Sequence, residues 1–115
     1  MKKCPCNNKA RIAELNDLAR TAMGVAGRLV QTSGINALPW QQQSRIRELV
    51  ETFSDFHPGN DPHHERDFGQ FTHGEVGVMW KIDYYDKALT AHSPDPSDPS
   101  VTERVITIML AEEYS

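Results

Sequence analysis

The segment Val105–Leu110 constrains the fold more than any other part of the chain. Its six residues, VITIML, are apolar or β-branched at every position, so neither side of an extended segment would be polar. Such a run favours a strand that is buried on both faces and therefore lies inside a sheet. The competing interpretation is a helix from Val101, because Ser100 would cap it and Glu103 would complete a capping box.

A β-hairpin is predicted upstream of this strand. From Val76 to Tyr85, apolar residues occupy every second position, which is the period of a strand with one apolar face. The segment Phe68–Thr72 precedes it, and a tight connection near His73-Gly74-Glu75 would make the two strands antiparallel neighbours. A further short strand is expected at Arg28–Thr32.

Two amphipathic helices are predicted in the first half of the chain. The first covers Ala10–Met23 and stops at Gly24, since glycine readily adopts the left-handed backbone of a helix end. The second begins at Pro39, because the missing N–H of proline costs nothing in a first turn. Apolar residues with helical spacing in the two segments are Ile12, Leu15, Ala19, Ala22, Ile46, Leu49, Val50 and Phe53.

The resulting order is α-β-α-β-β-β, and the predicted fold class is α+β. Two helices on one face of a mainly antiparallel four-stranded sheet would bury every apolar stripe. A chain of 115 residues suits a single domain, which we assign to residues 10–115 after a flexible tail at 1–9. The two cysteines, Cys4 and Cys6, fall in this tail, and we expect free thiols.

Charge and hydropathy narrow the choice of partners. Twelve Lys and Arg against sixteen Asp and Glu leave a net charge of −4, without a basic cluster. This balance argues against direct binding of nucleic acid and suits contact with a basic protein surface. The chain shows neither an apolar run of about 20 residues for a membrane span nor a secretory signal, so we expect a cytoplasmic protein.

Three acidic, turn-rich segments flank the predicted strands, at 60–67, 83–86 and 93–98. We expect them to meet at one end of the sheet, where they would bind a Lys- and Arg-rich protein surface that otherwise holds nucleic acid. The expected partner-binding residues are Asp61, Asp83, Tyr85, Asp86, Asp95 and Asp98. The alternative is that these aspartates only cap turns.

The His-rich segment 57–67 is the second candidate site. Its potential metal ligands are His57, His63, His64 and Asp67. Their types suit zinc, manganese or iron, but their spacing matches no metal motif, and a solvated loop is the other interpretation. Lys81 and Asp83 lie on the same face of the predicted strand. They would form either an exposed ion pair or a general acid–base pair. The sequence indicates no catalytic residue and no cofactor, and it leaves oligomeric state open.

Several stretches of the chain are similar to a known family pattern. They are Leu15-Asn16-Asp17, Asn60-Asp61-Pro62, Asp67-Phe68-Gly69, Lys81–Asp86 (KIDYYD), Ser93-Pro94-Asp95-Pro96 and Arg104–Tyr114 (RVITIMLAEEY). Together they resemble the proteobacterial domain-of-unknown-function family numbered 3768, from about Arg11 to the C-terminus. The resemblance implies a compact bacterial protein found among genes of plasmids and integrated elements, and it brings no activity or catalytic residues.

This chain departs from the family pattern at the His-rich segment. The pattern has a histidine just before Asp67, where this chain has Arg66, and no fixed histidines at His63 and His64. The histidine cluster of segment 57–67 is therefore partly specific to this sequence. Small size, acidity and absent catalytic motifs favour a binding protein that acts by protein–protein contact, and the mobile-element setting suggests an anti-CRISPR or antirestriction inhibitor. The alternative is a small metal-dependent hydrolase or nuclease that uses the His57–Asp67 loop.

Overall fold

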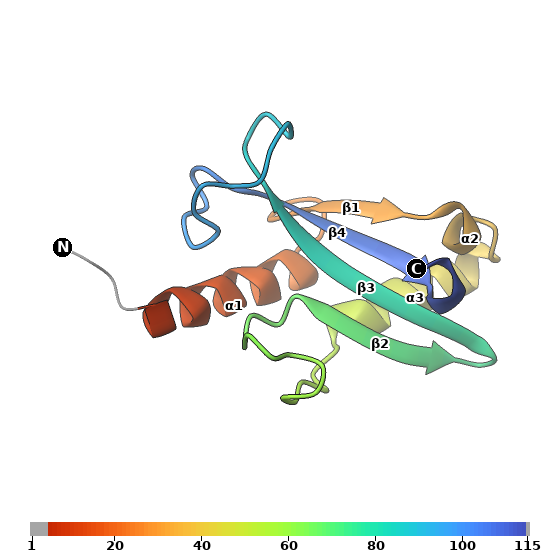
Figure 1. Cartoon of the computed structure of the whole chain (residues 1–115). Helices are drawn as coiled ribbons and strands as arrows, with labels where there is room; N and C mark the ends of the chain where they lie inside the picture. Colours follow the sequence, from red (N-terminus) through yellow and green to blue (C-terminus); the bar gives the residue numbers. More distant parts are fainter. Residues whose placement is uncertain (1–4, 115) are drawn as a thin grey trace.

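The computed structural model describes residues 5–114, which form helices and strands of an α+β fold (Figure 1). In chain order the elements are α1 (Pro5–Thr21), β1 (Arg28–Gln31), α2 (Ser33–Asn36), α3 (Trp40–Glu51), β2 (Phe68–His73), β3 (Val76–Tyr85), β4 (Glu103–Leu110) and the 3-10 helix η1 (Ala111–Glu113). The predicted α+β class is confirmed. No helix between residues 5 and 114 has both the length and the apolar character needed to cross a bilayer.

The four strands form one mixed sheet in the order β1-β4-β3-β2. Strand β4 pairs with β3 in the antiparallel direction and with β1 in the parallel direction. The predicted hairpin is confirmed, with Phe68 of β2 opposite Lys81 of β3. The central position of β4 also confirms the strand predicted at Val105–Leu110, so the alternative helix from Val101 is wrong.

The two faces of the sheet differ in what covers them. Ile106 and Ile108 of β4 are fully buried in one core cluster with residues of α1, α2 and α3. In Figure 1, α3 passes behind β3. On the opposite face of β4, Val105 and Thr107 are only half-buried. We expected β4 to be buried on both faces. This is wrong at Val105 and Thr107, because α1 and α3 both pack on the other side, but Met109 is buried on this face, opposite the buried Met79 of β3.

The first helix is longer than the sequence indicated. Helix α1 begins at Pro5, so it includes residues 5–9 that we assigned to a flexible tail. The predictions for Cys4 and for the Cys6 thiol lie outside the described part of the chain. The chain leaves α1 after Thr21, and Gly24 then takes the expected left-handed conformation with φ of +89°. The one-turn helix α2 was not predicted, and it buries Ile35 completely.

A buried arginine joins α1 to the end of α3. The guanidinium group of Arg20 lies over the Trp80 ring, 5.0 Å from its centroid. It donates hydrogen bonds to the carbonyl oxygens of Val50 and Phe53, each at 2.9 Å, and to Asp17 at 2.8 Å. A cation at the C-terminal end of a helix is favoured by the helix dipole. Arg20 therefore fixes how the two helices cover the sheet.

Candidate functional site

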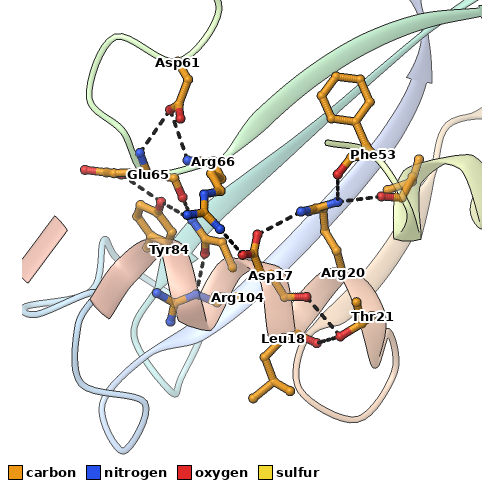
Figure 2. A network of polar contacts seen from close by, with 12 residues as sticks. Asp17, Leu18, Arg20, Thr21, Phe53, Asp61, Glu65, Arg66, Tyr84 and Arg104 are labelled. Atoms are coloured by element: carbon orange, nitrogen blue, oxygen red, sulfur yellow. Dashed lines mark hydrogen bonds and ion pairs between the residues drawn. The ribbon is translucent and has the colours of Figure 1, made fainter. Parts of the chain in front are cut away.

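Three segments that are far apart in the sequence meet around Tyr84, near the end of β3. The Tyr84 hydroxyl donates to the Glu65 carboxylate at 2.8 Å, which brings the loop before β2 to this strand. The guanidinium group of Arg104, on β4, lies 5.1 Å from the centroid of the Tyr84 ring. Figure 2 shows Glu65, Tyr84 and Arg104 gathered beside α1. The end of the sheet therefore holds a polar cluster.

Asn16 is the hub of this cluster, and it is fully buried. Its amide nitrogen donates to the Tyr84 hydroxyl at 2.8 Å and to the backbone oxygen of Glu65 at 2.9 Å. Its amide oxygen accepts a hydrogen bond from Nε of Arg104 at 2.7 Å. Arg104 also donates to the carbonyl oxygen of Pro96 at 2.6 Å, in the loop before β4. Asn16 on α1 thus ties the loop before β2 to β3 and β4, and Arg104 adds the loop before β4.

The turn that carries Glu65 has a strained backbone. The flanking residues His64 and Arg66 have φ of +59° and +55°, a region that side chains other than glycine rarely adopt. Each such residue costs about 1–3 kcal/mol and persists only where its surroundings hold it. The buried Asp61 carboxylate accepts hydrogen bonds from the N–H groups of Glu65 and Arg66, at 3.0 and 3.1 Å. Arg66 also forms an ion pair with Asp17.

The structure uses most of the predicted partner-binding aspartates to hold turns. Asp61 holds the strained turn, and Asp86 accepts a 2.9 Å hydrogen bond from the N–H of Thr90. This hydrogen bond is the main reason that the pKa of Asp86 is lowered. Asp95 and Asp98 accept hydrogen bonds from Ser97 and Ser100. Asp61 is buried, whereas Asp86, Asp95 and Asp98 stay half-exposed and accessible to a partner.

The other two predicted residues lie on the face of the sheet opposite the helices. Asp83 forms an ion pair with Lys81 at 2.7 Å, which is the exposed pair that the strand spacing allowed. Tyr85 is 37% exposed at the end of β3. Neither residue belongs to the Asn16 cluster.

A surface pocket of about 390 Å³ lies along the edge of β3, next to the Asn16 cluster. One side of the pocket is formed by Asp67, which lies just before β2. Its carbonyl oxygen accepts a hydrogen bond from the N–H of Ile82 at 2.8 Å. On the other side the chain returns to β3, where His92 forms an isolated antiparallel β-bridge with Tyr85. The side chains that give the pocket its chemistry are Asp67, Asp83, Tyr84, Tyr85 and His92.

Asp67 is the unusual group of this pocket. Its pKa is raised, first because the carboxyl group is partly removed from water and second because Glu65 is a nearby negative charge. Within residues 5–114, no lysine, arginine or histidine forms a salt bridge with Asp67. The pocket therefore contains a carboxylate without a salt bridge in the described chain, and the nearby His63 and the N–H of Asp67 itself offset the rise in its pKa only in part.

Replacement of Asp67 by asparagine is expected to stabilise the protein at neutral pH. A carboxyl group with a raised pKa in the folded state binds its proton more readily there than in the unfolded chain, so it makes stability fall as pH rises through the interval between the two pKa values. The asparagine side chain carries no charge and removes this dependence. Urea unfolding at several pH values measures the difference between variant and parent. The difference should vanish well below the ordinary pKa of aspartate; a variant less stable than the parent at neutral pH would contradict the assignment.

The candidate metal ligands of segment 57–67 do not lie together in the structure. His57, His63 and His64 are exposed, and Nδ1 of His57 accepts a hydrogen bond from the N–H of Gly59. Among the residues that the structure describes, no three His, Cys, Asp or Glu side chains are grouped closely enough to hold a metal ion. Asp67 instead lines the pocket described above.

Sequence reasoning missed Asn16, Glu65, Tyr84 and Arg104 as a group. A signal was present in two of them, because each interrupts an apolar pattern. Asn16 follows Leu15 and lies one helical turn after Ile12, within the buried stripe of α1. Arg104 is in phase with Ile106 and Ile108 on the buried face of β4. A polar residue at a core position needs a partner, and that requirement is the only sequence evidence for the cluster.

Comparison with known proteins gives one match. A family model described as "Protein of unknown function (DUF3768)" matches residues 31–113. The matched region includes the strained turn, β3 and β4, and therefore Glu65, Tyr84 and Arg104, while Asn16 lies before it. No curated protein and no solved structure matches the chain.

Proposed function

The chain belongs to the DUF3768 family, and we propose that it is a small binding protein that recognises a basic segment of a partner protein. The recognition site is the pocket beside Asp67, together with the acidic groups around its rim. A lysine or arginine side chain of the partner enters this pocket. The observation that carries the proposal is the half-buried Asp67 carboxylate, which forms no salt bridge within residues 5–114.

The chemistry of the pocket suits a cationic side chain. Burial of a carboxylate is unfavourable unless a cation or hydrogen-bond donors compensate it, and an incoming guanidinium group supplies both. The rings of Tyr84, Tyr85 and His92 also line the pocket. Aromatic faces attract lysine and arginine, with a contribution of about 0.5–2 kcal/mol that depends on exposure to water.

The surroundings of the pocket favour binding without rearrangement. Asn16 and Arg104 hold the two flanking loops against the sheet through buried hydrogen bonds. A site held in its binding conformation loses less conformational freedom when a partner arrives. Asp86 and Asp95, on the neighbouring loop, add negative charge that attracts a basic surface from a distance.

The partner that fits this chemistry best is a protein surface rich in Lys and Arg, such as one that otherwise holds nucleic acid. On the mobile-element setting that the resemblance implies, we propose a counter-defence inhibitor of the anti-CRISPR or antirestriction kind. In that role the protein occupies the nucleic-acid path of a defence complex. Its net charge of −4 is consistent with this competition.

A titration with nona-arginine peptide tests the pocket directly. Asp67→Asn is expected to weaken binding at least about tenfold, because the loss of one charge-assisted hydrogen bond of a partly buried pair costs about 1.5–3 kcal/mol. The matched control is Glu112→Gln, which removes the same charge from an exposed position on η1. Isothermal titration calorimetry at moderate salt measures both variants against the parent.

The outcomes separate a specific pocket from general attraction. Selective loss in Asp67→Asn, with Glu112→Gln unchanged, supports the proposed site. Equal weakening in both variants shows that only net charge attracts the peptide, and absence of binding to the parent shows that the pocket takes no arginine. Either of these two results contradicts the proposal. Affinity should also fall as the pH is lowered and Asp67 becomes protonated.

A further inference from the structure

Strand β2 forms one outer edge of the sheet, and its pairing leaves half of its backbone groups without partners. The N–H of Ile82 donates to the carbonyl oxygen of Asp67, which lies directly opposite. In an antiparallel ladder, positions that hydrogen-bond directly across alternate with positions that do not. Gly69, Phe71 and His73 consequently bond to β3. The N–H and C=O groups of Phe68, Gln70 and Thr72 point away from the sheet. In the described part of the chain, nothing hydrogen-bonds to these six groups.

This edge also lacks the features by which proteins prevent strands from pairing. Edge strands are usually protected by lysine, proline, a bulge or a covering segment. The sequence of β2, FGQFTH, contains no lysine, arginine, aspartate, glutamate or proline, and its register with β3 runs without a bulge. Gln70 and Thr72 are exposed. In Figure 1 no strand lies beside the outer edge of β2.

We propose that β2 pairs with β2 of a second copy of this chain, in the antiparallel direction about a two-fold axis at Gln70. In this register all three outward-facing residues of each strand form hydrogen-bonded pairs: Gln70 with Gln70, and Phe68 with Thr72 in both directions. Two four-stranded sheets then become one continuous sheet. Registers shifted by two residues in either direction would pair Thr72 with Arg66 or Phe68 with Gly74, and both Arg66 and Gly74 have positive φ.

The side chains on β2 suit this self-pairing. Phe71 of one copy lies opposite Gly69 of the other, on the face covered by helices. The indole of Trp80 occupies the space over Gly69, where an added Cβ would collide with Nε1 of the ring. Phe71 of the second copy would therefore meet the indole of Trp80 at this position, as an aromatic cross-strand neighbour. At the ends of the strand His73 lies opposite Asp67, so no like charges oppose one another.

The dimer would place His73 of the second copy opposite Asp67, but it can be tested apart from the proposed function because Gln70, the substituted residue, does not line the Asp67 pocket. Sedimentation velocity over a range of concentrations should show a dimer for the parent. Gln70→Lys and Gln70→Glu each place two like charges at the two-fold axis, so each variant alone should be monomeric. An equimolar mixture should form a heterodimer, since opposite charges then face each other. Gln41→Lys, on the exposed surface of α3, is the control and should remain dimeric.

Amide hydrogen exchange provides a test that needs no substitution. In the dimer the N–H groups of Phe68, Gln70 and Thr72 should be protected, and dilution should remove this protection while leaving β4 protected. A monomeric parent, or a dimer that persists in Gln70→Lys, would overturn the proposal. A parent that is monomeric alone but protects these amides only with another protein would show that the edge serves a different partner and would equally overturn it.

Discussion

Replacing Ile108 by aspartate is expected to leave the chain unfolded. Ile108 is fully buried in the central strand β4, opposite Trp80 of β3, and it belongs to the core cluster. An unpaired charge at such a position costs several kcal/mol. A domain of this size has a total stability of about 5–15 kcal/mol, so the substitution removes much or all of it.

The adjacent residue provides a matched control. Thr107 points to the face of the sheet opposite the helices, is half-buried, and lies opposite Lys81. Thr107→Asp introduces the same charge one position away, where water and a lysine compensate it. Thermal unfolding followed by circular dichroism should show a cooperative transition for Thr107→Asp and none for Ile108→Asp. Similar melting curves for the two variants would refute the assignment of the two faces of β4.

Replacing Asn16 by leucine is expected to destabilise the protein by about 2–4 kcal/mol, since it leaves several buried polar groups without partners. Leucine has nearly the same size, so the loss reflects hydrogen bonding more than a cavity. The groups left unpaired are the backbone oxygen of Glu65 and Nε of Arg104, while the Tyr84 hydroxyl loses one of its two bonds. Urea unfolding measures the change.

A double-mutant cycle with Tyr84→Phe tests whether the cluster acts as a unit. Tyr84→Phe removes only the hydroxyl and should cost about 1 kcal/mol. Asn16 and Tyr84 share a hydrogen bond, so the double variant should lose less stability than the two single variants added together. Additive losses would show that Asn16 and Tyr84 act independently. A loss below about 0.5 kcal/mol for Asn16→Leu would contradict the role of Asn16 as the hub.

The regular elements of the fold were largely predictable from short sequence patterns. The alternation from Val76 to Tyr85 and the run Val105–Leu110 correspond to β3 and β4, and the helical spacing around Ile46 corresponds to α3. These predictions succeed because the period of an apolar pattern follows from backbone geometry, which is local. The bounds were less accurate. Helix α1 begins five residues before Ala10, and the single turn α2 has no periodic signal.

The sequence predicted that the acidic loops lie at one end of the sheet, but it did not indicate which residues organise that end. The acidic loops do flank the end of β3, where Asp61 is buried and caps a turn. The groups that organise this end are Asn16, Glu65, Tyr84 and Arg104. Asp67, which was considered only as a metal ligand, lines the pocket instead.

By itself, the sequence determined which segments are helices and strands, because side-chain periodicity and turn formers act over a few residues. It also determined that β4 is an interior strand. Only the tertiary structure decided that β1 pairs with β4 in parallel, that both main helices cover the same face, and that Asn16 is a hub. Asn16 bonds to residues 49, 68 and 88 positions away. Contacts over such distances depend on how all the elements pack together, and no local pattern specifies that arrangement.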